Sequence, residues 1–284
     1  MTSGFDELSL ALFTALAPAG AVAFIVVALA RLGAASREEA VRIDRMCACP
    51  FSVCLVGFIA SATHLGTPAN ALHVFWGIGR SPLSNEVLSA VAFLFLVGAY
   101  WMMAFKRNFP DKIAKPWLVL TCAAAIVFIA CTSVAYSVDT VPTWNTTFTP
   151  VNLLFSGLLP GPLLGLLFTG LAQAQRPLGD LLVVAVASFA LVAGTIVLVA
   201  HQQSLALVAN NEIVASSLVP HYPLAIAAHA ALGITGITCA ALTLRRGAKH
   251  HNVIVLRVLA CVFALAAVFI TRLVFYQLHM TVGF

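Results

Sequence analysis

The chain has 284 residues, of which 61% are hydrophobic and only 9% are charged, and its mean hydropathy is +1.01. A soluble domain averages about 25% charged residues, so this chain has too little polar surface to cover a globule in water. The composition excludes a disordered chain, a coiled coil, a nucleic-acid-binding module and a soluble enzyme, and it predicts a protein embedded in membrane lipid. The net charge of +5 is a first indication of orientation, because Lys and Arg collect on the cytoplasmic side of membrane proteins.

Eight stretches are apolar over the length that crosses a bilayer, which is about 20 residues. The alternating runs typical of membrane β-barrels are not visible. The sequence therefore predicts an all-α fold, a polytopic membrane bundle of eight transmembrane helices that forms a single domain over residues 1–284. The predicted spans are Leu8–Leu32, Met46–His64, Glu86–Phe105, Trp117–Ala135, Val151–Ala172, Leu181–Ala200, Pro223–Leu244 and Val253–Tyr276.

The basic residues of the loops predict the orientation of the bundle. The residues before the first span, after the last span and in loops four and six contain no Lys or Arg, and loop two contains only Arg80. The positive-inside rule then places the odd-numbered loops in the cytoplasm and both termini on the extracytoplasmic side of the inner membrane. The basic residues of the odd-numbered loops are Arg31, Arg37, Arg42, Arg45, Lys106, Arg107, Lys112, Lys115, Arg176, Arg245, Arg246 and Lys249.

The start of the sequence predicts a retained first helix. Asp6 and Glu7 precede the first span and no Lys or Arg does, the reverse of the basic start of a cleavable signal peptide.

The three predicted outer loops are long for connections between helices, at about 15–22 residues. Long loops with polar and aromatic side chains often bind a partner. We therefore predict a soluble partner on the outer face, with solvated linkers as the alternative. The side chains in question are Trp76, Asp139, Trp144, Asn145, Asn210 and Glu212.

Five ionisable residues lie at the outer ends of the predicted helices. His64 ends the second span, Glu86 opens the third, His229 lies two turns into the seventh, and Arg272 and His279 lie at the end of the eighth. A charged side chain in the bilayer centre costs about 2.5–3.5 kcal/mol on insertion scales, so such residues usually pair or line a pathway. Their clustering predicts a functional site in the outer half of the bilayer.

Each of these residues has more than one interpretation. His64 is either a proton acceptor or donor to a polar ligand, or a histidine that interacts with the helix dipole. Glu86 follows a predicted N-cap at Ser81 and a proline at the first helical position, and is either a proton relay or a carboxylate favoured by the helix N-terminus. Arg272 is an ion-pair partner of Glu86 or Asp139, a ligand clamp, or a snorkelling side chain.

His229 also raises the alternative of haem ligation. A series of haems across the bilayer would need histidines at the inner depth as well, and no predicted span has one there, since His250 and His251 fall in a cytoplasmic turn. One outer haem remains an alternative.

Two further features have mainly structural interpretations. Pro160-Gly161-Pro162 interrupts the fifth span, and such a break either lines a cleft or forms a packing kink. The seven cysteines are odd in number and lie in or beside apolar runs, which argues against a disulfide framework. Cys47, Cys49 and Cys54 fall short of the four thiolates of an iron–sulfur cluster, so we expect no metal site.

Several polar segments, taken in order, resemble a known family. They are His64-Leu65-Gly66, Leu83-Ser84-Asn85-Glu86, Asp139-Thr140-Val141-Pro142-Thr143-Trp144 and Leu278-His279-Met280-Thr281-Val282-Gly283. With these segments the protein resembles, over essentially its whole length, the membrane anchor subunit of the dimethyl sulfoxide (DMSO) reductase family, the DmsC type.

The resemblance implies a haem-free subunit of eight helices with outward termini. It implies that the subunit holds an iron–sulfur subunit and a molybdopterin catalytic subunit on the outer face, oxidises menaquinol near the periplasmic face, and passes the electrons to the nearest iron–sulfur cluster in anaerobic respiration. The reduction of the terminal acceptor would belong to the catalytic subunit.

The resemblance also assigns roles to residues. It ties His64 and Glu86 to quinol binding and oxidation, and we add Arg272, Tyr276, His279 and Asp139 as candidate contacts of the quinol head group. Three other functions stay open at this point: a haem b quinol dehydrogenase subunit, a small-solute transporter, and a passive anchor.

Overall fold

The computed structural model describes residues 7–63, 68–105, 109–174, 176–245 and 250–280. Within these ranges the protein forms helices and no β-strand, apart from one isolated bridge between Ala209 and Val214. The helices are α1 (Leu8–Leu32), α2 (Arg37–Met46), α3 (Ala48–Ala62), η1 (Pro68–Gly77), α4 (Pro82–Ala104), α5 (Asp111–Ala135), α6 (Phe148–Leu158), α7 (Pro160–Leu171), α8 (Pro177–Ser204), η2 (Leu205–Leu207), η3 (Ala215–Ser217), α9 (Tyr222–Leu242) and α10 (His250–Gln277).

The prediction of eight spans is confirmed. In the described part of the protein, eight segments are long and apolar enough to cross a membrane. The first span has the predicted bounds. The second begins earlier than predicted, at Arg37, because the polar helix α2 continues into α3 after one intervening residue, Cys47. The fifth span is two helices, α6 and α7, which meet at Leu159.

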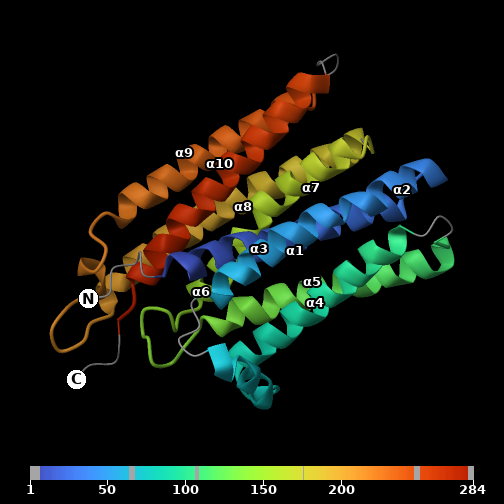
Figure 1. Ribbon diagram of the computed structural model, residues 1–284. Helices are drawn as coiled ribbons and strands as arrows, with labels where there is room; N and C mark the ends of the chain where they lie inside the picture. The colour runs from blue at the N-terminus through green and yellow to red at the C-terminus, as the bar shows by residue number, and fades with distance from the viewer. Residues whose placement is uncertain (1–6, 64–67, 106–108, 175, 246–249, 281–284) are drawn as a thin grey trace.

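Helix α1 occupies the centre of the bundle and is the most buried of the eight spans. It packs against α3, α5, α6, α7 and α10, with the α4–α5 pair on one side and the α9–α10 pair on the other (Figure 1). This placement follows from its composition, since seven of the fifteen buried residues of α1 are alanine and small side chains let neighbouring helices approach closely.

The Pro160-Gly161-Pro162 break combines both predicted interpretations. Gly161 contacts α1 so closely that a Cβ atom there would lie 2.5 Å from Cβ of Val22. Gly165, one turn further along α7, meets Val26 of α1 in the same way. Pro162 lines an apolar groove of about 660 Å³ between α1, α5, α6 and α8. The break is therefore a packing contact on one face and a groove wall on another.

Gly161→Ala is expected to lower the midpoint of thermal unfolding of the purified protein, because the added methyl group overlaps Val22 and overpacking of this kind costs about 1–3 kcal/mol. Gly98→Ala is the matched control, since a Cβ atom at Gly98 would lie 3.4 Å from the nearest atom of Phe51, an ordinary contact. An equal midpoint for the two variants in detergent would contradict the close approach of α1 and α7.

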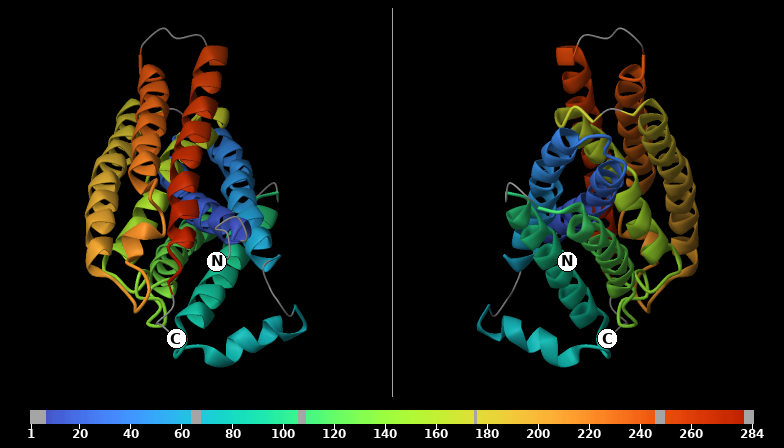
Figure 2. Two further views of the ribbon diagram at one scale, coloured as in Figure 1. Left: turned by 90° about the vertical axis from the view of Figure 1, so that its left-hand side faces the viewer. Right: turned by 90° about the vertical axis from the view of Figure 1, so that its right-hand side faces the viewer.

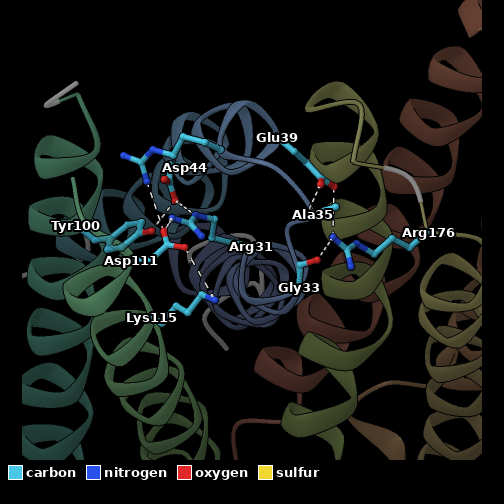
Figure 3. A network of polar contacts seen from close by, with 10 residues as sticks. Arg31, Gly33, Ala35, Glu39, Asp44, Tyr100, Asp111, Lys115 and Arg176 are labelled. Carbon is cyan, nitrogen blue, oxygen red and sulfur yellow. Dashed lines mark hydrogen bonds and ion pairs between the residues drawn. The ribbon is translucent and has the colours of Figure 1, made fainter. Parts of the chain in front are cut away.

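A polar network joins the helices at one end of the bundle, which we call the Arg31 end. Arg31 is 1% exposed and donates from Nε to Oδ1 of Asp44 at 2.8 Å and from Nη2 to Oδ1 of Asp111 at 2.7 Å (Figure 3). The hydroxyl of Tyr100 donates to the same Oδ1 of Asp44 at 2.5 Å. Beside this network, Arg176 contacts the carbonyl of Gly33. Basic residues that predicted orientation thus also hold α1, α2, α4 and α5 together.

The opposite end, which we call the Glu86 end, contains the start of α1 and the end of α10 (Figure 1). The hydroxyl of Tyr276 on α10 contacts the carbonyl of Leu10 on α1 at 3.4 Å. The loop after α5 covers this junction, and its Trp144 donates from Nε1 to the carbonyl of Phe275 at 2.9 Å. Helix η1 lies across the same end, below α4 (Figure 2).

Candidate functional site

The turn before α4 fixes the position of Glu86. As predicted, Ser81 is the N-cap and accepts a hydrogen bond from the amide of Ser84, and Pro82 begins the helix. Gly79 has a φ of +79°, a left-handed conformation that favours glycine. Its amide donates to Oδ1 of Asn85 at 2.8 Å. Glu86 therefore lies in the first turns of a well-capped helix.

Glu86 lines a groove of about 290 Å³ at this end of the bundle, which we call the Glu86 groove. Apart from Glu86, Ser61 and the phenol of Tyr136, its walls are apolar. This composition is typical of a site for an apolar ring with a few polar contacts. The walls come from α1 (Leu10, Phe13), α3 (Phe58, Ser61, Ala62), η1 (Leu72, Val74, Phe75), α4 (Leu83, Glu86, Val87) and the residue after α5 (Tyr136).

The Glu86 carboxyl group is buried without a full set of partners. The residue is 3% exposed, and its Oε1 has no hydrogen-bond partner among the described residues. The hydroxyl of Thr132 on α5 lies beside it and also lacks a partner in the described part of the protein. Because an unsatisfied buried polar group costs about 1–3 kcal/mol, the arrangement favours a ligand hydroxyl or a water molecule that bonds to Glu86.

His64 lies outside the described residues. Helix α3 ends at Ala62, and Ser61 and Ala62 both line the Glu86 groove. The segment that leads to His64 therefore forms part of the groove wall.

Tyr136 is a groove residue that was not predicted from the sequence. It caps the C-terminus of α5, one helical turn after Thr132, so the two lie on the same face of the helix. Desolvation, together with the neighbouring Tyr276 and Glu86, raises the pKa of the Tyr136 phenol well above its ordinary value. The phenol therefore stays protonated and can donate a hydrogen bond to a ligand. The i, i+4 spacing of Thr132 and Tyr136 is the sequence feature that could have indicated that the two side chains lie together.

Arg272 does not line the groove, and the predicted ion pairs with Glu86 and Asp139 are wrong for the described structure. Arg272 is 2% exposed, and no carboxylate of the described residues lies within 4.0 Å of it. Its Nε donates to Oγ1 of Thr14 at 3.0 Å. Its guanidinium carbon lies 4.2 Å from the ring centroid of Phe275 and 5.9 Å from that of Tyr136. Aromatic faces therefore surround this cation.

The remaining predicted contacts lie next to the groove or outside it. Tyr276 is buried, and its ring meets the ring of Tyr136 edge to face at 6.0 Å. Asp139 is exposed and accepts a hydrogen bond from Nδ2 of Asn145 at 2.8 Å within the loop between α5 and α6. His279 is exposed, with its ring 5.1 Å from that of Trp144. None of the three lines the groove.

His229 and His201 lie around a second, smaller cavity. His229 is buried, and its Nδ1 contacts the carbonyl of Ala267 at 3.0 Å. His201 falls just beyond the predicted end of the sixth span at Ala200, but α8 continues to Ser204 and buries it. The described residues contain no group of three His, Cys, Asp or Glu that could hold a metal ion.

Comparison with known proteins gives one consistent family. Residues 1–278 match the model of the "DMSO reductase anchor subunit (DmsC)" family. The protein is 33% identical over 287 residues to the C chain of the anaerobic dimethyl sulfoxide reductase of Escherichia coli, and 31% identical over 283 residues to the anaerobic dimethyl sulfoxide reductase chain YnfH of the same species. It is 28% identical over 286 residues to the corresponding C chain of Haemophilus influenzae. Each alignment covers 100% of this protein and 98% of the relative. The protein therefore belongs to the DMSO reductase anchor subunit family.

Proposed function

We propose that the protein is the menaquinol-oxidising membrane anchor of a molybdopterin reductase complex of the DMSO reductase type. The observation that carries the proposal is the buried Glu86 carboxyl group, whose Oε1 has no partner among the described residues, in the wall of an apolar groove. A quinol has an apolar ring and two hydroxyl groups, and the Glu86 groove offers apolar walls, a carboxylate acceptor and the Tyr136 phenol.

The chemistry requires two proton acceptors. Oxidation of a quinol to a quinone releases two electrons and two protons, and the quinol itself supplies the redox chemistry. Glu86 accepts one hydroxyl proton and His64 accepts the other, since a histidine side chain titrates near neutral pH. Both protons then leave through the water at the Glu86 end. The electrons leave as well, to an iron–sulfur cluster of the partner subunit.

The Glu86 end is the natural docking side for that partner. Electrons must leave close to where the quinol binds, so the iron–sulfur subunit and the molybdopterin subunit dock at this end. Apolar side chains exposed there, Leu72 and Trp76 of η1 and Leu207 of η2, support such docking. The basic residues at the opposite end support, by the positive-inside rule, an extracytoplasmic Glu86 end with both termini outside.

The subunit is proposed to work without haem. The cavity beside His201 and His229 has about 20 Å³, room for about one water molecule and far too little for a porphyrin. A Soret band in the purified anchor subunit would contradict this part of the proposal and favour a haem b quinol dehydrogenase.

The paired variants Val87→Trp and Leu88→Trp test the groove. Val87 lines the groove, whereas the adjacent Leu88 is 40% exposed and is not part of the groove wall. We expect Val87→Trp to weaken the binding of a fluorescent quinol-analogue inhibitor to the intact complex at least tenfold, about 1.4 kcal/mol, because the indole occupies the space of the ring. Leu88→Trp is expected to bind as the unmodified complex does.

The same variants separate quinol oxidation from anchoring. Val87→Trp is expected to lower turnover with a menaquinol analogue while it leaves turnover with a water-soluble artificial electron donor unchanged. Unchanged inhibitor binding and quinol turnover in Val87→Trp would contradict the proposed site and leave the protein as a passive anchor.

A further inference from the structure

The apolar groove beside Pro162, which we call the Pro162 groove, shares no lining residue with the Glu86 groove. It has about 660 Å³ and its walls come from α1, α5, α6, α7 and α8. Among the described residues that line it, Ser133 alone has a polar side chain, and its hydroxyl donates to the carbonyl of Ile129 at 2.7 Å. The groove therefore offers a ligand no free hydrogen-bonding side chain, and its chemistry suits a hydrocarbon chain.

The Pro162 groove is open to the surroundings of the bundle. Its walls include apolar side chains that are each more than half exposed, namely Leu29 of α1, Ile126 of α5 and Leu182 of α8. All three lie on helices that are long and apolar enough to cross a membrane. In a bilayer these side chains face acyl chains, so a lipid reaches the groove without passing through the protein.

At the Arg31 end the Pro162 groove continues into a polar cavity of about 280 Å³, which we call the Arg176 mouth because Arg176 lines it. The two spaces share four lining residues and are therefore continuous. Along α1 the distance from Ala30 in the mouth to Val22 in the groove is about 12 Å. This is close to the hydrocarbon depth of one leaflet, about 15 Å. The shared residues are Val26, Leu29, Leu182 and Val183.

Arg176 gives the mouth a cation whose hydrogen bonds are incomplete. Its Nη2 contacts the carbonyl of Gly33 and lies 3.3 Å from Oε1 of Glu39 (Figure 3). Its Nε is buried and has no partner among the described residues. Because the Arg176 side chain is 39% exposed, the ion pair with Glu39 is weak. Arg42 also interacts electrostatically with Glu39, so two arginines share one carboxylate and a positive charge remains.

The other polar side chains of the mouth are already paired. Asp180 on α8 accepts a hydrogen bond from Nη2 of the buried Arg257 at 2.9 Å. The hydroxyl of Thr169 donates to a backbone carbonyl of its own helix at 2.9 Å. Among the described residues of the mouth, Arg176 is therefore the polar side chain left for a ligand, and its charge favours an anion.

We propose that the Pro162 groove and the Arg176 mouth together bind an anionic phospholipid. An acyl chain lies in the groove, and the phosphate accepts hydrogen bonds from the Arg176 guanidinium, whose planar fork matches phosphate oxygens. Basic pockets between transmembrane helices are typical sites for anionic head groups. A quinone tail would also suit the groove, but it brings no negative charge to Arg176. The inference is independent of the quinol site, which shares none of these residues.

The head group is expected to decide which lipid binds. An acyl chain that moves from the bilayer into the groove stays in an apolar environment, so its burial adds little to the affinity. One arginine near the membrane surface favours an anionic over a zwitterionic lipid by about fivefold. The site is therefore expected to select phosphatidylglycerol over phosphatidylcholine.

Native mass spectrometry of the intact complex tests the head group. The complex is released from micelles that contain equal amounts of phosphatidylglycerol and phosphatidylcholine, and the retained lipids are identified by mass. We expect phosphatidylglycerol to be retained about fivefold more than phosphatidylcholine, and Arg176→Gln to bring this ratio close to one. The matched control is Arg45→Gln, which removes an exposed arginine of α2 that does not line the mouth and is expected to keep the ratio. Equal retention of the two lipids by the unmodified complex, or a ratio that Arg176→Gln leaves in place, would overturn the inference.

Val186→Trp tests the groove, and it serves if Arg176→Gln does not assemble. Val186 lines the groove and is 43% exposed, whereas Val192 on the same helix is 60% exposed and is not part of the groove wall. Val186→Trp is expected to lower the retention of phosphatidylglycerol about tenfold, because the indole occupies the path of the acyl chain. Val192→Trp is expected to retain the lipid as the unmodified complex does. Equal retention by the two variants would overturn the inference.

Two other occupants of the groove would give different spectra. A quinone tail would appear as retained quinone that Val186→Trp releases and Arg176→Gln does not. A second copy of the protein would appear as a dimer of the complex that Val186→Trp dissociates. Either result, without retained phospholipid, would overturn the inference.

Discussion

Glu86→Gln is expected to lower quinol-dependent turnover of the intact complex about 100-fold, the lower range for loss of a general base. Glutamine has nearly the same shape as glutamate but cannot accept the quinol proton. The groove walls are unchanged, so a quinol-analogue inhibitor is expected to bind with an affinity within a few fold of the original. Turnover with an artificial electron donor is expected to stay the same, because that route bypasses the groove. The measurement is the ratio of the two turnover rates in membranes with equal amounts of assembled complex.

Two controls make this result specific. Glu212→Gln removes an exposed carboxylate from the loop between α8 and α9 and is expected to leave both rates unchanged. Glu86→Asp keeps a carboxylate on a shorter side chain and is expected to retain part of the quinol-dependent rate. If Glu86→Gln oxidised quinol at the original rate, Glu86 would be a structural residue at the start of α4.

The number of spans could be predicted from the sequence because a bilayer imposes length and apolarity on each one. The span boundaries that were predicted wrongly depend on tertiary contacts. Hydropathy placed the start of the second span at Met46, but the polar helix α2 is held against the bundle by Asp44, which pairs with Arg31. Hydropathy likewise ended the sixth span before His201, whose burial depends on Tyr222 and Thr143, residues from other segments. The sequence around each of these residues does not indicate such contacts with distant segments.

The candidate site was likewise predictable only where its signals are local in the sequence. Glu86 could be identified because a carboxylate at the start of an apolar span is rare and has a visible helix cap beside it. Arg272 is equally rare, yet its neighbours could not be identified, since Thr14 lies 258 positions away in the sequence. One of the three interpretations of Arg272 from the sequence was an ion pair, and at that position the structure has aromatic rings and a hydroxyl. Tyr136 was missed because a tyrosine at a helix end is common in membrane proteins.

Asp44→Ala is expected to destabilise the protein by about 3 kcal/mol, in the range for a buried ion pair that loses one partner. Asp44 is 2% exposed and accepts hydrogen bonds from both Arg31 and Tyr100, so its removal leaves a buried guanidinium half compensated and a phenol without its acceptor. Arg31 keeps Asp111, which is half exposed, and this contact limits the loss. The checks are the midpoint of thermal unfolding in detergent and the amount of assembled complex in the membrane.

We attribute the expected destabilisation of Asp44→Ala to the disrupted network and not to the loss of one negative charge as such. Three variants separate these two explanations. Glu38→Ala removes an exposed carboxylate from the same helix, α2, and is expected to change stability by less than about 0.5 kcal/mol. Asp44→Asn keeps a hydrogen-bond acceptor for Tyr100 and is expected to lose less stability than Asp44→Ala. Arg31→Met combined with Asp44→Leu removes both charges and should recover much of the stability, because no uncompensated ion remains buried. If the double variant were as unstable as the sum of its single variants, the two residues would act independently, and the Arg31 end would owe its stability to apolar packing alone.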